Sequence, residues 1–204
     1  PNGLKIHRDG RIFVACYKHG IVEVHPDSGK VETVLGSAYS EGFKGTNDLH
    51  FASNGDLYFT DQGQTGIADP TGRVYRWTAD GSLDQLANNV PSPNGITLST
   101  NEKTCFVAVT RSQQIWRLPL MADGNPSKTG VAIQLSGGHA GPDGLECDAD
   151  GGLVVCHIGL GIWRFDDNFL PTHLIHAGDT ARFMTNIAFG GPDNRELYIT
   201  DSVN

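Results

Sequence analysis

The chain has 204 residues, of which 38% are hydrophobic and 19% are charged, as is usual for a globular protein. Its 23 acidic residues outnumber its 15 lysines and arginines, and the formal net charge is −8. Because no basic cluster is present we expect no nucleic-acid partner, and because the apolar runs are only strand-sized we expect no membrane-spanning segment. The 26 glycines and 10 prolines supply the turns that a fold of many short strands requires.

A polar residue at the start of a short apolar run recurs every 43 to 49 residues along the chain. Repeats of this length are typical of solenoids, propellers and arrays, and this one matches the length of a propeller blade. Each copy continues with a turn seven residues after the polar residue and then with a second apolar run. The polar residues that begin the five copies are Asn2, Asn47, Asn94, Asp143 and Asn186.

In chain order, each repeat predicts a series of strands joined by tight turns. The second run of each copy is richest in residues that favour strands. These second runs cover 12–16, 57–60, 105–109, 153–156 and 197–200. A third run follows in four copies, at 21–24, 74–77, 115–118 and 162–165. A weaker fourth run, such as 83–86, predicts an exposed outer strand, and no window has a sustained helical period, so the sequence predicts an all-β fold.

These repeats predict a single β-propeller domain over residues 1–204, of which about four and a half blades are present. The sequence opens directly in the repeat motif and stops after the second strand of the last copy. An incomplete ring leaves open sheet edges, which natural sheet proteins avoid. We therefore expect the chain to be truncated at both ends, with the first blade and the end of the last blades missing.

The polar residues that begin the repeats predict a shared site. In a propeller the first strand of each blade lines the central channel, so these side chains should converge at one mouth. Asn-Gly and Asp-Gly are also ordinary turn formers, which is the better explanation for any one copy alone. The hairpin turn is already supplied seven residues later, which favours a ligand role for Asn47, Asn94 and Asp143 taken together. Two amides and one carboxylate are oxygen donors that suit a hard cation, calcium above all, whereas zinc would favour nitrogen and sulfur.

The eight histidines are scattered, and a direct metal role for any of them is the minority interpretation. His139 and His157 are expected in or near loops of the fourth repeat. His139, four residues before Asp143, could help to shape the pocket. The histidines expected at the surface or at sheet edges are His19, His25 and His50.

The four cysteines fall on predicted strands of different repeats, without the spacing of a metal site. Free thiols in a reducing compartment are the favoured interpretation, with disulfides as the alternative. This favours a cytoplasmic protein. The cysteines are Cys16, Cys105, Cys147 and Cys156.

Three motifs occur in a fixed order: Thr46-Asn47-Asp48, then Ser92-Pro93-Asn94-Gly95, then Gly141-Pro142-Asp143-Gly144-Leu145. Together they resemble the senescence marker protein (regucalcin) and gluconolactonase family of six-bladed propellers. The likeness extends over nearly the whole chain, and the bacterial lactonases of that group are the most similar. The resemblance implies a divalent metal in the central channel, commonly calcium, and hydrolysis of small lactones or related esters.

By this resemblance, Asn94 and Asp143 match the metal-binding asparagine and aspartate of the family. Asn47 matches an asparagine that binds metal in some members and substrate in others. Asp48 would be a carboxylate behind the ligands that orients them or a deeper ion. The alternative for Asp48 is an aspartate at a strand start that bonds its own backbone. The remaining candidates for contact with the substrate or support of the ligands are Asn186 and His139.

The family also has a glutamate ligand in a Glu-Gly-Pro motif of its first blade, ahead of Pro1 in this numbering. Glu41-Gly42-Phe43 matches that motif in neither position nor context. Either the blade that carries the glutamate lies outside this chain or the site is degenerate. We therefore expect the coordination shell to be short by one carboxylate, which counts against activity of the chain by itself.

The resemblance implies a mechanism in which the cation binds the lactone carbonyl oxygen and a carboxylate accepts a proton from the attacking water. Asp143 is the candidate base as well as a ligand, with a water activated by the ion as the alternative base. No Gly-x-Ser-x-Gly motif is present, which disfavours a serine nucleophile. Two loops, 62–71 and 136–141, are expected to overhang the mouth and to choose the substrate.

Two other functions stay open. One is hydrolysis of phosphorus esters on the same metal site, as in diisopropyl fluorophosphatase. The other is a non-catalytic propeller that binds a partner through its faces, with the repeated polar residues serving only structure.

Overall fold

The computed structural model of the chain describes residues 1–176, 178 and 183–202. Within these residues the regular structure is antiparallel strand, apart from two short 3-10 segments, η1 (Thr110–Ser112) and η2 (Pro192–Asn194). The all-β prediction is therefore confirmed. The chain divides into two compact units, unit 1 (Pro1–Ile96) and unit 2 (Thr97–Asn204).

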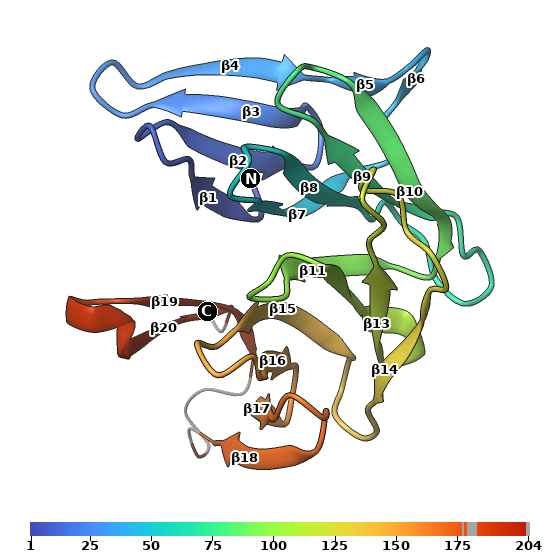
Figure 1. The fold of residues 1–204 in the computed structure, drawn as a ribbon, viewed down its shortest axis with the longest axis vertical. Helices are drawn as coiled ribbons and strands as arrows, with labels where there is room; N and C mark the ends of the chain where they lie inside the picture. The colour runs from blue at the N-terminus through green and yellow to red at the C-terminus, as the bar shows by residue number, and fades with distance from the viewer. Residues whose placement is uncertain (177, 179–182, 203–204) are drawn as a thin grey trace. The chain divides into compact units, whose positions relative to one another are not determined.

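Unit 1 contains two four-stranded antiparallel sheets, one for each of the first two repeats (Figure 1). In both sheets neighbouring strands are also neighbours in the chain, so each sheet is a meander. The first sheet consists of β1 (Leu4–Ile6), β2 (Ile12–Cys16), β3 (Gly20–His25) and β4 (Lys30–Leu35). The second consists of β7 (Thr46–Phe51), β8 (Leu57–Asp61), β9 (Gly72–Trp77) and β10 (Leu83–Val90). A small hairpin connects them in sequence, formed by β5 (Ser37–Ala38) and β6 (Glu41–Gly42).

The third sheet begins with β11 (Pro93–Leu98), the strand in which one unit ends and the next begins. It continues with β12 (Thr104–Val109), β13 (Gln114–Pro119) and β14 (Gly130–Gln134). The fourth sheet consists of β15 (Pro142–Cys147), β16 (Leu153–His157), β17 (Gly161–Phe165) and β18 (Pro171–Ile175). The fifth repeat contributes the pair β19 (Met184–Gly190) and β20 (Glu196–Asp201).

Aromatic packing forms the core of unit 1. Phe13 of the first sheet lies in one buried cluster with Leu49, Phe59 and Tyr75 of the second. The rings of Phe59 and Tyr75 stack with centroids 5.3 Å apart, and Phe43 packs edge-on against both. Because Leu49 is part of this cluster, the core fixes strand β7, the strand that carries the first predicted ligand.

The core of unit 2 has two parts, each joining strands of different repeats. One cluster joins β12 and β13 to β15 and β16 through residues that include Phe106, Ile115, Leu145 and Val155. The other joins β16 and β17 to β19 through Val154, Cys156, Ile162, Met184 and Ile187. Strand β16 contributes to both clusters because alternate side chains of a strand point to opposite faces.

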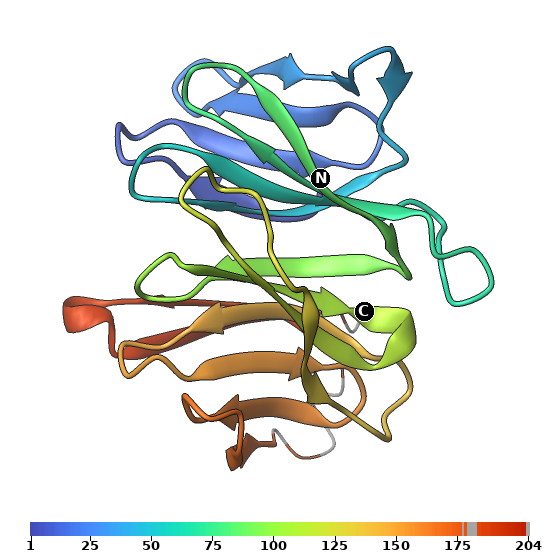
Figure 2. The same ribbon diagram turned by 45° about the vertical axis from the view of Figure 1, so that its right-hand side comes forward.

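Several of the expected strands are confirmed by this arrangement. The predicted outer strand at 83–86 is β10, and the two middle strands of each of the first four repeats pair as expected. All four cysteines lie on strands and are free thiols, but the expectation that they belong to different repeats is wrong for Cys147 and Cys156, which lie on β15 and β16 of the fourth sheet. Loop 62–71 projects as a long excursion after β8 (blue-green in Figure 2). In the part of the chain that the structure describes, no helix is long and apolar enough to cross a membrane.

Candidate functional site

A β-bulge lies at the start of the first strand in three of the repeats. Between the pairs Thr46–Asp61 and Leu49–Phe59, strand β7 has one residue more than its partner β8. Bulges bend a strand, re-aim side chains and are over-represented next to active sites. The corresponding irregularities lie between Pro142–His157 and Leu145–Val155, and between Met184–Asp201 and Asn186–Thr200.

These registers correct the alignment of the last repeat by one residue. Asn47 and Asp143 occupy the same place in their bulges, directly after the first paired residue. Asn186 comes one place later, in register with Asp48, and Thr185 occupies the place of Asn47. The fifth repeat therefore offers a hydroxyl, not an amide, at the position of the predicted ligands.

Asn47 is held by a short chain of hydrogen bonds. Its Nδ2 donates to Oε1 of Gln62 at 2.7 Å, and Nε2 of Gln62 donates to Oγ of Ser92 at 2.9 Å. Asn47 is only 7% exposed, and its Oδ1 accepts no hydrogen bond from any described residue. An amide oxygen without a protein partner has lone pairs available to coordinate a cation.

Asn94 is fixed through its backbone and leaves its side chain uncommitted. Its carbonyl oxygen accepts a hydrogen bond from Oγ1 of Thr60 at 2.6 Å, and the same Oγ1 accepts from the backbone N of Asp48 at 3.1 Å. Thr60 thus ties β7 to β11. The Asn94 side chain is 8% exposed and makes no hydrogen bond to another described residue. Its amide atoms are not among the fully buried polar atoms that lack a partner, so they keep a small solvent contact through which a ligand or ion could reach them.

Asp48 bonds its own strand, as the alternative interpretation of the sequence proposed. Its Oδ1 accepts from the backbone N of Leu49 at 2.9 Å and lies against Gly3, where an added Cβ would come within 2.0 Å of it. Asn186 repeats this arrangement in unit 2. Its Oδ1 accepts from the backbone N of Ile187 at 2.8 Å and would lie 2.1 Å from a Cβ at Gly144. A direct role for either side chain toward a ligand stays a prediction.

A buried ion pair supports the start of β7. The carboxylate of Asp61, which has no exposed surface, accepts from the backbone N of Gly45 at 2.8 Å and from Nε of Arg73 at 2.7 Å. Arg73 also donates to the carbonyl of Gly42 and to the carboxylate of Glu41. The ion pair therefore fastens the connecting hairpin and the segment that leads into Asn47. No sequence pattern indicated it, because neither residue belongs to the repeated motif.

Asp143, in unit 2, is half-buried at the second position of β15. Oγ1 of Thr110 donates to the carbonyl of Pro142 at 2.8 Å, and Gly141 packs so closely on Thr110 that an added Cβ would lie 2.0 Å from its carbonyl oxygen. The thiol of Cys156 is close by. Burial, and secondarily the charge of Asp143, raises the pKa of Cys156 far above its ordinary value.

His157 lies at the end of a strand, directly before a turn, which agrees with the expectation of a position in or near a loop. It is the last residue of β16, is 1% exposed, and its Nε2 is 3.2 Å from the carbonyl oxygen of Gly137. Burial lowers its pKa, although the carbonyl partners act in the opposite direction. His139 is exposed, as expected of a loop residue, and its ring stacks on that of Phe183 with centroids 6.4 Å apart. The loop 136–141 is thus held to β16 by His157.

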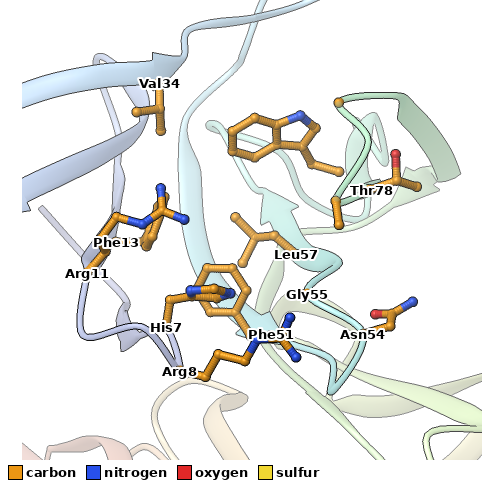
Figure 3. Close-up of a pocket in the computed structure, with 13 residues that line it drawn as sticks. His7, Arg8, Arg11, Phe13, Val34, Phe51, Asn54, Gly55, Leu57 and Thr78 are labelled. Carbon is orange, nitrogen blue, oxygen red and sulfur yellow. The ribbon is translucent and has the colours of Figure 1, made fainter.

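Among the described residues, no group of three or more histidine, cysteine or acidic side chains is gathered as for a metal ion. The three predicted ligands would not form such a group, because Asp143 is the only one of them with an acidic side chain. A cavity of about 300 Å³ is present in unit 1, lined by residues that include His7, Phe51 and Leu57 (Figure 3). It lies at the far end of β7 from Asn47 and contains none of the predicted site residues.

Comparison with known proteins identifies the family. Residues 1–203 match the family described as SMP-30/Gluconolactonase/LRE-like region, and the chain belongs to it. It is 33% identical over 177 residues to Lactonase drp35 of Staphylococcus aureus (strain MRSA252), which covers 79% of this chain and 51% of that protein. It is 30% identical to the Gluconolactonase of Zymomonas mobilis subsp. mobilis, covering 100% of this chain and 61% of that protein. The chain thus spans between half and two thirds of the length of these curated relatives.

Solved structures agree with the fold. A putative gluconolactonase superposes with a TM-score of 0.85 at 24% identity, covering 98% of this chain and 71% of that one. A calcium-binding protein, regucalcin, from Agrobacterium tumefaciens superposes with a TM-score of 0.78 at 25% identity, covering 97% and 66%. The predicted fold class, a β-propeller present in part, is therefore confirmed.

Proposed function

We propose that the protein to which this chain belongs is a metal-dependent hydrolase that opens a small lactone of the gluconolactone kind. The observation that carries the proposal is the pair of amide side chains of Asn47 and Asn94. Both are more than nine-tenths buried, and neither amide oxygen accepts a hydrogen bond from a described residue. The names of the relatives, gluconolactonase and lactonase, support the reaction class.

The residues proposed to hold the cation are Asn47, Asn94 and Asp143. Amide and carboxylate oxygens are the ligands that calcium prefers, and the sulfur or nitrogen ligands typical of zinc are not part of this set. Calcium is also supported by the regucalcin structure, which is described as a calcium-binding protein. When bound, such a cation would polarise the lactone carbonyl and favour attack by water.

Asp143 is proposed as the group that accepts the proton of the attacking water. The bulge in β15 and the bond from Thr110 to the Pro142 carbonyl hold its backbone in place. Cys156, its neighbour, is not a candidate nucleophile, because burial raises the pKa of the thiol and keeps it protonated. The chemistry proposed here therefore needs no covalent intermediate on the protein.

The test is calorimetric titration of the full-length protein with calcium after chelation, followed by an assay with gluconolactone. We expect calcium binding, hydrolysis that chelation removes and calcium restores, and loss of about a hundredfold or more in turnover for Asp143→Asn. Asp150→Asn is the matched control, because Asp150 is an exposed aspartate of the same sheet region and should leave turnover unchanged.

Unchanged turnover in Asp143→Asn would overturn the proposed base. Hydrolysis that does not depend on calcium would overturn the metal role. A phosphorus ester cleaved while the lactone is not would replace the substrate class, and calcium binding without hydrolysis of either would move the proposal to a non-catalytic binding protein.

A further inference from the structure

The hydrogen-bond chain from Asn47 through Gln62 to Ser92 ends in a hydroxyl, which can either donate or accept a hydrogen bond. In the structure Asn47 donates to Gln62 and Gln62 donates to Ser92. A serine hydroxyl can accept or donate, since its hydrogen rotates to suit the partner. No other side-chain hydrogen bond commits the Ser92 hydroxyl among the described residues. The chain can therefore run in the opposite sense, with both amides turned over and Ser92 donating to Gln62.

The two senses present different atoms of Asn47 to a ligand. In the observed sense the Nδ2 of Asn47 faces Gln62, and its Oδ1 is available to a cation. In the reversed sense Oδ1 would accept from Gln62, and the NH₂ group would be available to an oxygen of a substrate. The side chain of Gln62 thus determines which kind of ligand Asn47 can bind.

Hydrogen bonds hold the backbone of Gln62 in place. Its backbone N donates to the carbonyl of Gly45 at 2.9 Å, and its carbonyl accepts from Oγ1 of Thr65 at 2.7 Å. The same Oγ1 accepts from the backbone N of Ser92 at 3.1 Å. The hydroxyl of Thr65 therefore ties the backbone of Gln62 to that of Ser92.

The backbone of Ser92 has a strained conformation. Its φ of 67° lies in the left-handed region, which is uncommon for a residue other than glycine, and it is 3% exposed. Such strained residues persist where the surrounding structure demands them, and they cluster at functional sites. Ser92 comes two residues before Asn94, so the strained turn connects the chain of amides to the second predicted ligand.

We propose that Gln62 is a positioning residue that selects whether Asn47 presents its oxygen to a cation or its NH₂ group to a substrate oxygen, with Ser92 allowing both senses. The proposal rests on the proposed function, because it assigns Asn47 to the same site. It makes the selection a property of Gln62, a residue that lies outside the repeated motif.

Two substitutions of Gln62 should have opposite effects in the full-length protein. Gln62→Glu can only accept, from Asn47 and from the Ser92 hydroxyl, so it fixes the observed sense and should leave calcium affinity equal to wild type or higher. Gln62→Met has a similar length but no hydrogen bonds, and calcium affinity should fall about tenfold or more, as for other residues that orient metal ligands. Calcium calorimetry measures both.

Controls separate the added charge from the hydrogen bonds. Gln64 is an exposed glutamine of the same loop, and its Nε2 donates to the hydroxyl of Tyr17 at 3.0 Å. Gln64→Glu adds the same charge, and Gln64→Met removes the same group, but neither should change calcium affinity by more than about twofold. A further readout is the side-chain NH₂ signal of Asn47 in metal-free NMR spectra, assigned by its loss in Asn47→Asp. This signal should shift in Gln62→Met and persist in Gln62→Glu.

The outcomes distinguish this inference from the proposed function. If Asn47→Ala does not change calcium affinity, the proposed ligand set is wrong. If Asn47→Ala weakens calcium binding but Gln62→Met leaves the affinity and the Asn47 signal unchanged, only the role of Gln62 is wrong. Equal losses in Gln62→Glu and Gln62→Met would also overturn it, because a residue of merely structural importance would not distinguish an acceptor from an apolar chain.

Discussion

The starts of β7 in unit 1 and of β15 in unit 2 carry the same bulge, yet different side chains hold the two backbones. The residue that pairs with the first residue of the strand is Asp61 in one case and His157 in the other. Asp61 is a buried carboxylate paired with Arg73, whereas His157 is a buried imidazole bonded to a backbone carbonyl. The two repeats therefore share the register of the bulge but differ in how the buried side chain beside it is paired, by an ion pair in one and by a hydrogen bond to a carbonyl in the other.

The position that follows the predicted ligand takes part in the same kind of contact in both units. Asp48 follows Asn47 and packs against Gly3, whereas Gly144 follows Asp143 and receives the side chain of Asn186. In both units a side chain that bonds its own backbone fits against a neighbouring glycine. In both units the glycine belongs to one repeat and the side chain to the next repeat along the chain, so the two contacts are equivalent.

Breaking the ion pair in unit 1 should have the largest effect. Arg73→Met leaves the fully buried carboxylate of Asp61 without its charged partner, which should lower the free energy of unfolding by about 3–5 kcal/mol. Urea unfolding measures it. Arg117→Met, at an exposed arginine, should stay within about 0.5 kcal/mol of wild type. Similar small losses in both variants would show that the Asp61 site is not closed to water.

Filling the glycine positions tests whether the packing in the two units is equivalent. Gly144→Ala and Gly3→Ala each place a Cβ about 2 Å from a side-chain oxygen and close to the backbone of the facing strand. Each should lower the free energy of unfolding by about 1–3 kcal/mol, as overpacking does. Gly130→Ala is the control, because nothing lies within 4 Å of its added Cβ. If only one of the two variants is destabilised, the equivalence of the two contacts is wrong.

The repeat length and the alternation of apolar residues were sufficient to predict the meanders, because each strand is defined by neighbours close in the sequence. The position of Asn186 was not predictable at that level. A bulge adds one residue to a strand, and a spacing that varies between repeats does not reveal a slip of one. The correct register needs the pairing of Asn186 with Thr200, which only the folded strands show.

The candidate ligands could be predicted from the sequence, but the residues that hold them in place could not. Asn47, Asn94 and Asp143 stand in repeated motifs, so the sequence points to them directly. Gln62 lies 15 residues from Asn47 and 30 from Ser92, in a loop that the sequence marked only as a possible cover for the site. Contacts between residues so far apart in the sequence follow from the fold, and no local sequence pattern indicates them.

The smallest expected effect is a pH dependence that unit 2 owes to His157. Burial lowers the pKa of this imidazole below its ordinary value of 6.5, so the folded state holds it neutral. As the pH falls below 6.5, the unfolded chain takes up a proton that the folded chain does not. The free energy of unfolding should therefore decrease from pH 6.5 down to the lowered pKa, below which this contribution becomes constant.

His157→Gln isolates that contribution, because its amide NH₂ can still donate to the carbonyl of Gly137 but has no proton to gain. The rest of the chain is identical in the two proteins, so the difference between the two stability curves reports His157 alone. We expect wild type to lose stability relative to the variant between pH 7 and about pH 5, measured by urea unfolding at each pH. Parallel curves would mean that His157 is protonated as easily in the folded chain as in the unfolded one. In that case unit 2 would hold its bulge with a charged group after all, and the contrast with Asp61 and Arg73 would be lost.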